Sequence, residues 1–405
     1  LGSALIRKPD LDERDLSTSF YYSICVGIFM YVALFFAAPW IADFYNTPVL
    51  IPLIRVTALS FLWGPLNTPQ GVLMKKKLNF KTPAKISVAT KVFSAIVGIG
   101  LAFCGYGLWA LVISGVLSGL FSTILNWLAV RWMTKTGWSK DSFKYLWGFG
   151  NKMMLSGMLD TLYNNIAPIF IGKYYSPAQL GVYNRAQGYA AMPSQNVTGV
   201  IANVSFPVLS QIQDDDERLA YNYRRMLKVS AFVIFPVMLM LSALARPLVI
   251  TMITAKWEAC IILLQIICFS MMWYPIHAIN LNLLQVKGRS DLFLRLEIIK
   301  KVLGLSILVI TLPLGLVYFC LGNIVSSMFS LVVNTYYTGK LINVGYFKQM
   351  RDLLPIFGLS LFMWLSVHCA IYFIPNMLLQ IFVGGCVGLI IYLGVSFLFK
   401  FDELK

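Results

Sequence analysis

The chain has 405 residues, of which 58% are hydrophobic and 12% are charged, and its mean hydropathy is +0.73. Soluble domains are about 45–50% apolar and about 25% charged, so this composition excludes an ordinary water-soluble protein. The aromatic content of 14% excludes a disordered chain. The formal net charge is +16, but the cations form short clusters between apolar stretches, so nucleic acid is not an expected partner. We therefore predict a polytopic membrane protein.

Twelve stretches of the chain are candidates for membrane-spanning helices, because about 20 apolar residues cross a hydrocarbon core about 30 Å thick. They are Thr18–Ile41, Val49–Leu73, Ile86–Phe103, Leu108–Val130, Tyr145–Ile171, Gly181–Phe206, Val229–Leu244, Ala259–Leu284, Ile298–Pro313, Leu316–Tyr337, Leu353–Ile374 and Met377–Phe399. The sequence thus predicts an all-α polytopic membrane protein with twelve transmembrane helices in this chain.

The lysines and arginines lie mainly on one side of these predicted spans. Of the 33 cations, 26 fall on that side, and the opposite loops contain only Lys173, Arg246 and Lys256. Cytoplasmic loops of membrane proteins are enriched in Lys and Arg. We therefore expect the side with 26 cations, and with it both ends of this chain, to face the cytoplasm.

Two motifs recur and indicate an internal repeat. The sequence Asp-Leu-Asp-Glu-Arg at residues 10–14 returns as Asp-Asp-Asp-Glu-Arg at 214–218, each time just before a predicted span. The sequence Trp-Gly-Pro at 63–65 returns as Trp-Tyr-Pro at 273–275, each time inside the second span after the acidic motif. The order and position of both motifs predict two related halves.

The two halves do not match at their starts, because the second half has two predicted spans before its acidic motif and the first half has none. The chain also begins with Leu1. We therefore expect an N-terminally truncated chain that lacks two of fourteen helices. The expected organisation is an N-lobe at 1–138 without its first two helices, a C-lobe of six helices at 139–344, and a C-terminal helix pair at 345–405.

Ionisable side chains inside spans are functional candidates, because each costs about 2.5–3.5 kcal/mol at the centre of a membrane. The sequence places five there, namely Arg55, Lys91, Lys152, Asp160 and Arg185. In the span at 145–171, Lys152, Ser156, Asp160 and Asn164 recur every four residues and draw one polar stripe along a helix. The next span is also polar, with Asn196 among its amides, so the two helices predict a hydrated cavity between the halves.

The candidate cavity residues are therefore Lys152, Arg185, Arg55, Lys91, Asn164 and Asn196, with Asp160 as the candidate for ion coupling. Other interpretations stay open. Arg55, Arg185 and Lys91 could extend to lipid headgroups, and Asp160 could neutralise a nearby cation. Pro65 and Pro275 could serve packing or could mark broken helices, which are common in transporters.

Catalysis and metal binding find little support in the sequence. It contains no phosphate-binding loop, no H-E-x-x-H and no G-x-S-x-G motif, so we expect a protein that is not an enzyme. The seven cysteines are scattered without a C-x-x-C pair, and His277 and His368 lie far apart in apolar surroundings. Neither a metal site nor a cofactor is predicted. A mostly cationic cavity favours an anionic substrate.

Residues 170–186, Phe-Ile-Gly-Lys-Tyr-Tyr-Ser-Pro-Ala-Gln-Leu-Gly-Val-Tyr-Asn-Arg-Ala, strongly resemble the Wzx-type polysaccharide flippases of the multidrug/oligosaccharidyl-lipid/polysaccharide exporter superfamily. Further landmarks resemble its colanic-acid-type branch: Leu-Gly-Ser-Ala-Leu-Ile at 1–6, Gly-Tyr-Gly-Leu-Trp-Ala-Leu at 105–111, Ala-Arg-Pro-Leu at 245–248, and Lys-Trp at 256–257. The resemblance covers nearly the whole chain.

The resemblance implies two pseudo-symmetric lobes of a fourteen-helix protein plus a final helix pair. It further implies that an undecaprenyl-diphosphate-linked oligosaccharide is flipped across the bacterial inner membrane by alternating access, for lipopolysaccharide or exopolysaccharide assembly. Its expected partners are this lipid-linked oligosaccharide, membrane lipids and other polysaccharide-assembly membrane proteins. Two alternatives remain, a cation-coupled multidrug exporter of the same superfamily and a membrane glycan polymerase or ligase.

Overall fold

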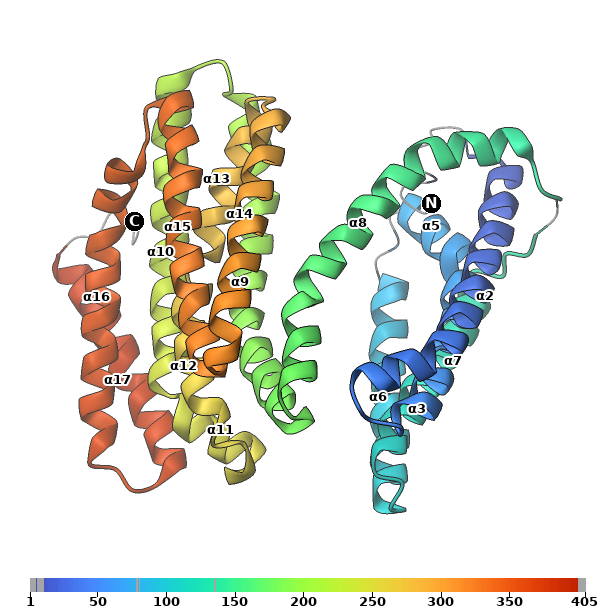
Figure 1. Ribbon diagram of the computed structural model, residues 1–405. Helices are drawn as coiled ribbons and strands as arrows, with labels where there is room; N and C mark the ends of the chain where they lie inside the picture. Colours follow the sequence, from blue (N-terminus) through green and yellow to red (C-terminus); the bar gives the residue numbers. More distant parts are fainter. Residues whose placement is uncertain (1–4, 6–10, 78, 80, 135, 400–405) are drawn as a thin grey trace. The chain divides into compact units, whose positions relative to one another are not determined.

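The computed structural model describes residue 5 and residues 11–399 except 78, 80 and 135. The side chains of residues 148–153, 155–157, 159, 160, 202–204, 206, 207 and 290 lie outside this description. Within the described part of the chain, all regular structure is helical (Figure 1). The predicted all-α class is therefore confirmed.

Two compact units make up the chain, residues 1–166 and residues 167–405. The first contains α2 (Glu13–Phe44), α3 (Leu50–Thr57), α4 (Ser60–Trp63), η1 (Gly64–Asn67), α5 (Thr68–Lys76), α6 (Lys81–Phe103) and α7 (Leu108–Ala129). The second contains α9 (Pro177–Gln211), α10 (Asp216–Ala243), α11 (Ala245–Ile253), η2 (Ala255–Trp257), α12 (Cys260–Met271), α13 (Tyr274–Val286), α14 (Ser290–Thr311), η3 (Leu312–Leu314), α15 (Leu316–Ile342), α16 (Tyr346–Tyr372) and α17 (Met377–Leu398). The boundary falls inside α8 (Lys140–Tyr174). The division into lobes after residues 138 and 344 stays a prediction.

In the described residues, nine helical segments are long and apolar enough to cross a membrane. They are Glu13–Phe44, Leu50–Lys76, Lys81–Phe103, Leu108–Ala129, Asp216–Ala243, Cys260–Val286, Leu316–Ile342, Tyr346–Tyr372 and Met377–Leu398. The other three predicted spans coincide with α8, α9 and α14, which are helical but more polar. The number of twelve membrane crossings therefore stays a prediction.

Exposed aliphatic side chains show why this fold needs lipid. On α6, Val88, Val92, Ile96 and Ile99 follow one face at helical spacing, and each is between 54% and 66% exposed. A continuous apolar stripe of this kind is unfavourable in water. In the second unit, by contrast, 56% of the apolar stretch of α10 is buried against its neighbours.

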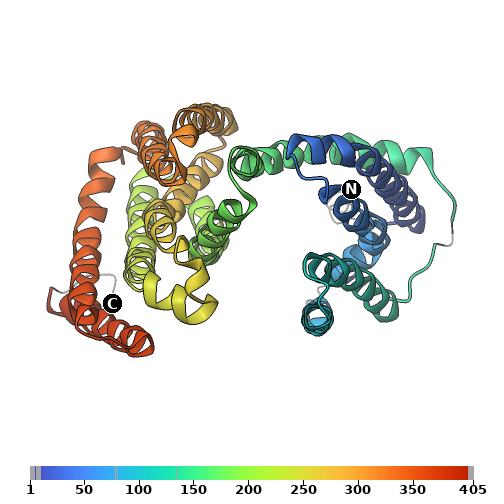
Figure 2. The ribbon, with the colours of Figure 1, turned by 60° about the horizontal axis from the view of Figure 1, so that its bottom comes forward.

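Helix α10 is the centre of the second unit, and α16 packs along it. Tyr223, Leu227, Phe235 and Met238 of α10 are fully buried. Helices α16 and α17 lie side by side at one flank of this unit in both views (Figures 1 and 2).

The two acidic motifs each cap the N-terminus of a helix. The Asp12 carboxylate accepts a hydrogen bond from the Glu13 backbone amide (2.6 Å), and the Asp15 carboxylate accepts one from the Asp12 amide (3.1 Å). The Asp215 carboxylate accepts one from the Arg218 amide (3.0 Å). Each motif thus pairs backbone amides that a helix start leaves unbonded.

The two Trp-x-Pro motifs also occupy equivalent places, because each interrupts a helical segment. At Pro65 the chain leaves α4 for the 3₁₀ helix η1, and at Pro275 it passes from α12 to α13. Proline lacks the amide hydrogen that would continue the helix. The interpretation of both sites as breaks in a helix is therefore confirmed.

Three of the carbonyls that prolines leave unbonded in the described helices accept hydrogen bonds from side chains of other helices. Proline at position i frees the carbonyl at i−4. Pro39 in α2 frees the Phe35 carbonyl, which the Arg55 Nε contacts at 3.3 Å.

The same compensation occurs twice in the second unit. Pro236 frees the Phe232 carbonyl, which accepts a hydrogen bond from the Tyr392 hydroxyl (2.8 Å). Pro275 frees the Met271 carbonyl, which accepts one from the Ser194 hydroxyl (2.7 Å). Because lipid offers no hydrogen-bond donors, such partners must come from the protein.

Candidate functional site

Arg185 lies in a small cluster of a cation and aromatic rings in the second unit. It projects from α9 and is exposed, with its guanidinium carbon 5.3 Å from the centroid of Trp257 and 5.8 Å from that of Tyr189. Aromatic faces attract cations at such distances and also stack against apolar faces of ligands. A guanidinium additionally presents a planar set of donors that matches phosphate and carboxylate oxygens.

A short turn with an unusual backbone presents Trp257 to Arg185. Thr254 joins α11 to η2 with φ 78° and ψ 161°, a conformation that side chains other than glycine rarely adopt. Such backbone strain costs about 1–3 kcal/mol and is held only where the surrounding structure enforces it. The turn places Trp257 at the end of η2, next to α9.

Asn196 shares the polar face of α9 with Arg185. The two are about three helical turns apart and both are exposed. The opposite face is anchored, because Ser194 is buried and bonds the Met271 carbonyl of α12. Helix α9 therefore packs on one face and presents predicted site residues on another.

Helix α8 has the continuous α-helical backbone that the predicted polar stripe requires. Asn164, in the first unit, is exposed. The side chains of Lys152, Ser156 and Asp160 lie outside the described residues. Their assignment to a cavity and to ion coupling stays a prediction.

Arg55 has a well-defined structural partner. Its Nε lies 3.3 Å from the Phe35 carbonyl, and its guanidinium carbon lies 4.2 Å from the centre of the Phe35 ring. Arg55 thereby ties α3 to the proline-containing turn of α2. A cavity role for Arg55 stays a prediction, and its contact with α2 gives it a second role in packing.

Lys91 lines a polar pocket of about 300 Å³ between α6 and α7. Hydroxyl and amide side chains share this pocket, including Thr90, Ser122 and Asn126. The Thr90 hydroxyl is buried and has no hydrogen-bond partner in the described part of the chain. The predicted site residues of the first unit, Arg55 and Lys91, thus have different surroundings.

A larger pocket of about 450 Å³ opens at the break in the helix near Pro65. Its walls come mainly from α2 and from the interrupted segment, with Tyr22, Ser60 and Phe61 among the lining residues. The described lining holds hydroxyls and apolar groups and no cation. The proline motif gave a signal for this location, although the sequence analysis assigned it no site.

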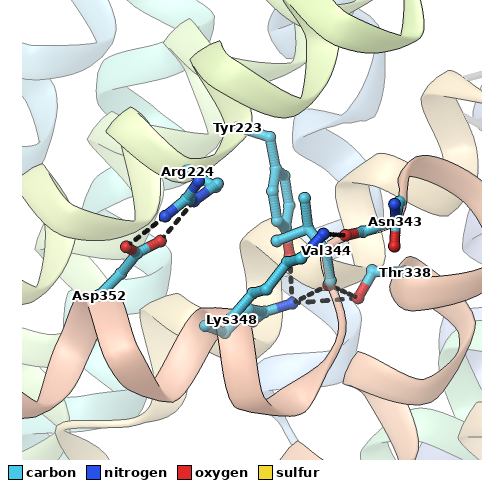
Figure 3. A network of polar contacts seen from close by, with 8 residues as sticks. Tyr223, Arg224, Thr338, Asn343, Val344, Lys348 and Asp352 are labelled. Atoms are coloured by element: carbon cyan, nitrogen blue, oxygen red, sulfur yellow. Dashed lines mark hydrogen bonds and ion pairs between the residues drawn. The ribbon is translucent and has the colours of Figure 1, made fainter.

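A buried polar network in the second unit escaped the sequence analysis (Figure 3). The Gln349 amide nitrogen lies 3.0 Å from the Thr338 hydroxyl, 3.0 Å from the Val344 carbonyl and 3.2 Å from the Tyr223 hydroxyl. The Asn280 amide donates to the Gln349 side-chain oxygen (3.2 Å). These groups belong to α10, α13, α15, α16 and the turn after α15, and they join the four helices.

A charge pair lies beside this network (Figure 3). Arg224 of α10 binds Asp352 of α16 through two hydrogen bonds of 2.6 Å. Lys348 Nζ donates to the Asn343 carbonyl (2.8 Å), where a left-handed residue with φ 56° ends α15. Asp352 lies 128 residues from Arg224 and Gln349 lies 126 residues from Tyr223, so spacing along the sequence could not reveal these contacts.

In the described residues, no group of three or more His, Cys, Asp or Glu side chains could hold a metal ion. The arrangement instead offers cations, aromatic faces and amides. Cations of this kind bind anionic groups, and aromatic faces stack against apolar faces of a ligand.

Residues 1–262 match the family described as polysaccharide biosynthesis protein. The teichuronic acid biosynthesis protein TuaB of Bacillus subtilis is 28% identical over 72% of this chain, which spans 61% of the length of TuaB. The lipopolysaccharide biosynthesis protein WzxC of Escherichia coli is 24% identical over 92% of this chain and 74% of its own. The succinoglycan biosynthesis transport protein ExoT of Rhizobium meliloti is 24% identical over 64% of this chain and 52% of its own.

Solved structures with the same fold are also transport proteins. The lipid II flippase MurJ in its inward closed conformation superimposes with a TM-score of 0.79 at 16% identity, over 100% of this chain and 88% of that one. An outward-facing multidrug resistance transporter of the MATE family gives a TM-score of 0.54 at 13% identity, over 84% of this chain and 82% of that one. At these identities, the likeness shows the fold alone.

Proposed function

The chain belongs to the polysaccharide biosynthesis protein family, and from this premise we propose that the protein flips lipid-linked oligosaccharides. The substrate is an oligosaccharide repeat unit carried on undecaprenyl diphosphate. It moves from the cytoplasmic to the periplasmic leaflet of the bacterial inner membrane, for export of surface polysaccharide. The expected mode is alternating access, without catalysis.

The family match carries this proposal. It covers residues 1–262, and it agrees with the Wzx-type resemblance of the motifs at 105–111, 170–186 and 245–248. TuaB, WzxC and ExoT are named for the biosynthesis of three different polysaccharides, and ExoT is named a transport protein. Transport of lipid-linked glycans that differ in their sugars accounts for both the shared family and the low sequence identity.

Energetics explain what such a protein must supply. A diphosphate headgroup cannot cross dry hydrocarbon unaided, because burying an unpaired charge costs far more than thermal energy. Cations and amides along a hydrated path lower this barrier, while the prenyl tail stays in lipid. Rocking of one half of the protein against the other then moves the opening between the two leaflets.

Arg185 is the described side chain that fits this task best. Its guanidinium is exposed, it has no carboxylate partner in the described part of the chain, and two aromatic rings flank it. We assign it to the diphosphate or to an acidic sugar, with Trp257 as a stacking surface. Lys152, Lys91, Asn164 and Asn196 extend the polar path, and Asp160 is the candidate for ion coupling.

The decisive experiment is lipid-linked glycan analysis in cells with and without the intact gene, by mass spectrometry combined with leaflet-specific labelling. We expect single undecaprenyl-diphosphate repeat units to accumulate on the cytoplasmic leaflet without the gene and to disappear when it is restored. Units that reach the periplasmic leaflet and remain unpolymerised would contradict the proposal and favour a polymerase or ligase.

An unchanged lipid pool would favour the multidrug exporter instead, whose fold this chain shares with a TM-score of 0.54. The matched control is a strain without other polysaccharide flippases, so that a second transporter cannot conceal the loss. In that strain, an unchanged pool contradicts the proposal.

A further inference from the structure

An apolar groove of about 610 Å³ lies on the first unit at the end of α7. Ligand pockets of proteins have volumes of about 300–1,000 Å³ and mostly apolar walls, so the groove has the size of a binding site. Its lining comes from η1, from α7 and from the segment that follows α7, with Leu66, Trp127 and Met133 among the residues. None of the predicted cavity residues is in this described lining, so the groove is distinct from the candidate site.

The groove runs along α7 from the end of the helix inward. Thr123, Trp127 and Arg131 of its lining recur every four residues, which places them on one helical face. The Arg131 amide donates to the Trp127 carbonyl (2.9 Å), so the helical turn continues past Ala129. Eight residues span about 12 Å along a helix axis, and one leaflet of the hydrocarbon core is about 15 Å thick. The groove therefore has about the depth of one leaflet, and the predicted topology places Arg131 at the cytoplasmic surface.

Two tryptophans form walls whose positions are fixed by contacts with the rest of the first unit. Trp127 Nε1 donates to the Leu66 carbonyl (3.1 Å), and Trp132 Nε1 donates to the Glu13 carboxylate (3.1 Å). The ring of Phe20 lies 6.3 Å and 5.9 Å from these two rings, measured between centroids. Because both indole N–H groups are bonded within the protein, the walls offer a ligand only their apolar ring faces.

The remaining lining is aliphatic and open to its surroundings. Ile124, Leu128 and Met133 are 48%, 64% and 66% exposed. The Thr123 hydroxyl donates to the Gly119 carbonyl of its own helix (2.9 Å), so it is also bonded within the protein. Lipid tails are as apolar as these side chains, so shape and van der Waals packing decide which chain stays in contact with them. A concave apolar groove of this depth fits one acyl chain.

Arg131 gives the groove a single charged end. Its side chain is exposed and forms no ion pair with a carboxylate in the described part of the chain. Glu13, which contacts the wall of the groove, bonds the Trp132 indole. A guanidinium presents a planar set of donors that matches phosphate oxygens. Anionic lipids gather in the cytoplasmic leaflet and are attracted by cations at its surface. The groove thus combines an apolar chain site with one site for an anionic headgroup.

We propose that this groove binds one anionic phospholipid of the cytoplasmic leaflet. The phosphate contacts Arg131, and one acyl chain lies along α7 against Trp127 and Leu128. Charge complementarity selects the anionic lipid, because the ammonium group of a zwitterionic headgroup would compete with Arg131 for the phosphate. The inference is independent of the flippase assignment, since no step of transport enters it.

Photo-crosslinking in lipid nanodiscs tests the proposal. The probe is phosphatidylglycerol with a photoactivatable diazirine in one acyl chain, and the matched probe is phosphatidylcholine with the same chain. Mass spectrometry of the digested protein locates the label. We expect label on residues 123–133, roughly fivefold more from phosphatidylglycerol than from phosphatidylcholine. Equal labelling by the two probes, or labelling no denser than on the exposed aliphatic stripe of α6, overturns the proposal.

Three variants separate the headgroup contact from the chain contact. Arg131→Ala should abolish the preference for phosphatidylglycerol and keep the chain label, because the apolar walls remain. Arg351→Ala removes an exposed arginine of the second unit on the same predicted side of the membrane, so the preference should persist. Leu128→Trp should fill the groove and lower labelling by both probes. A preference that survives Arg131→Ala contradicts the proposed headgroup contact.

Competition identifies the class of lipid. An excess of unlabelled phosphatidylglycerol should displace the probe from residues 123–133, whereas the same amount of a polyprenyl phosphate should not. Displacement by the polyprenyl phosphate alone would overturn the phospholipid assignment, because the groove would then hold an isoprenoid chain. None of these measurements requires flipping, so their outcome and the outcome for the proposed function are independent.

Discussion

The guanidinium groups of Arg185 and Arg55 make different contacts. Arg185 is exposed between the rings of Tyr189 and Trp257, and no described carboxylate holds it. Arg55 bonds the Phe35 carbonyl that Pro39 leaves free. Removal of Arg55 would therefore combine a packing defect with any change in transport, which makes Arg185 the better probe of substrate binding.

We expect Arg185→Ala to lower the rate of flipping by about 10- to 100-fold, since a hydrogen bond to a charged group is worth roughly 1.5–3 kcal/mol. Expression and thermal stability should stay close to those of the unmodified protein, because the side chain is exposed. Lys152→Ala should act in the same direction. The measurement is leaflet-resolved analysis of the lipid-linked glycan in cells that lack the original gene.

Arg246→Ala is the matched control for Arg185. Arg246 is also an exposed arginine of the second unit, and it pairs with Glu258 at 3.5 Å. Its removal should leave flipping unchanged. If both Arg185→Ala and Lys152→Ala are as active as the unmodified protein, the assignment of these residues to the cavity is wrong.

Sequence reasoning at the residue scale succeeds where one helix carries the signal and fails where partners are distant. The acidic residues before α2 and α10 are recognisable because a helix start is a local feature. The hydrogen-bond contacts of His277 in α13 give no such signal, since its partners Ser327 and Asn334 in α15 lie 50 and 57 residues further along the chain. The apolar sequence around His277 therefore gave no indication of these polar contacts.

At the element scale, three carbonyls that prolines leave free, in α2, α10 and α12, are bonded by side chains from neighbouring helices. The Tyr392 hydroxyl of α17 donates a hydrogen bond to the Phe232 carbonyl, which Pro236 leaves free in α10. Proline chemistry predicts the free carbonyl four residues before Pro236, but the hydroxyl that bonds it lies 160 residues further along the chain. Helix positions could thus be predicted from the sequence, whereas the contacts that join the helices could not.

We expect Tyr392→Phe to lower the thermal stability of the purified protein, because an unpaired buried carbonyl costs about 1–3 kcal/mol. In a Pro236→Ala background the same change should cost less, since an alanine amide can bond the Phe232 carbonyl. The interaction between the two changes, about 1 kcal/mol, is measured by a double-mutant cycle of melting curves.

Tyr372→Phe serves as the control for this cycle, because Tyr372 is 82% exposed and its hydroxyl should contribute little. Strictly additive effects of Tyr392→Phe and Pro236→Ala would show that the hydroxyl does not compensate for the proline.

At the scale of the whole molecule, charge decides orientation. The predicted loops with 26 cations should lie in the cytoplasm. In a cysteine-free background, we expect Lys256→Cys to react in intact cells with a thiol reagent that cannot cross the inner membrane. Lys348→Cys should react only after the inner membrane is opened.

The reverse labelling pattern would invert the predicted topology, and the pair of sites controls for reactivity.

The repeat gains support from the equivalent places of its two motifs, at helix starts and at helix breaks. The boundary between the two compact units has no comparable local marker, because it falls inside α8, which is one continuous helix from Lys140 to Tyr174. Composition and charge thus predict that the chain is a membrane protein and predict its topology, but they do not predict how the helices pack.

The contacts between α10 and α16 have a consequence for genetics. Tyr223 is fully buried and Arg224 is held by Asp352, so both depend on a helix that begins only at Tyr346. A premature stop codon just before α16 would leave the buried Tyr223 hydroxyl without Gln349, and the Arg224 guanidinium without Asp352. Such nonsense alleles should behave as complete nulls removed by membrane quality control, even though most of the reading frame is intact.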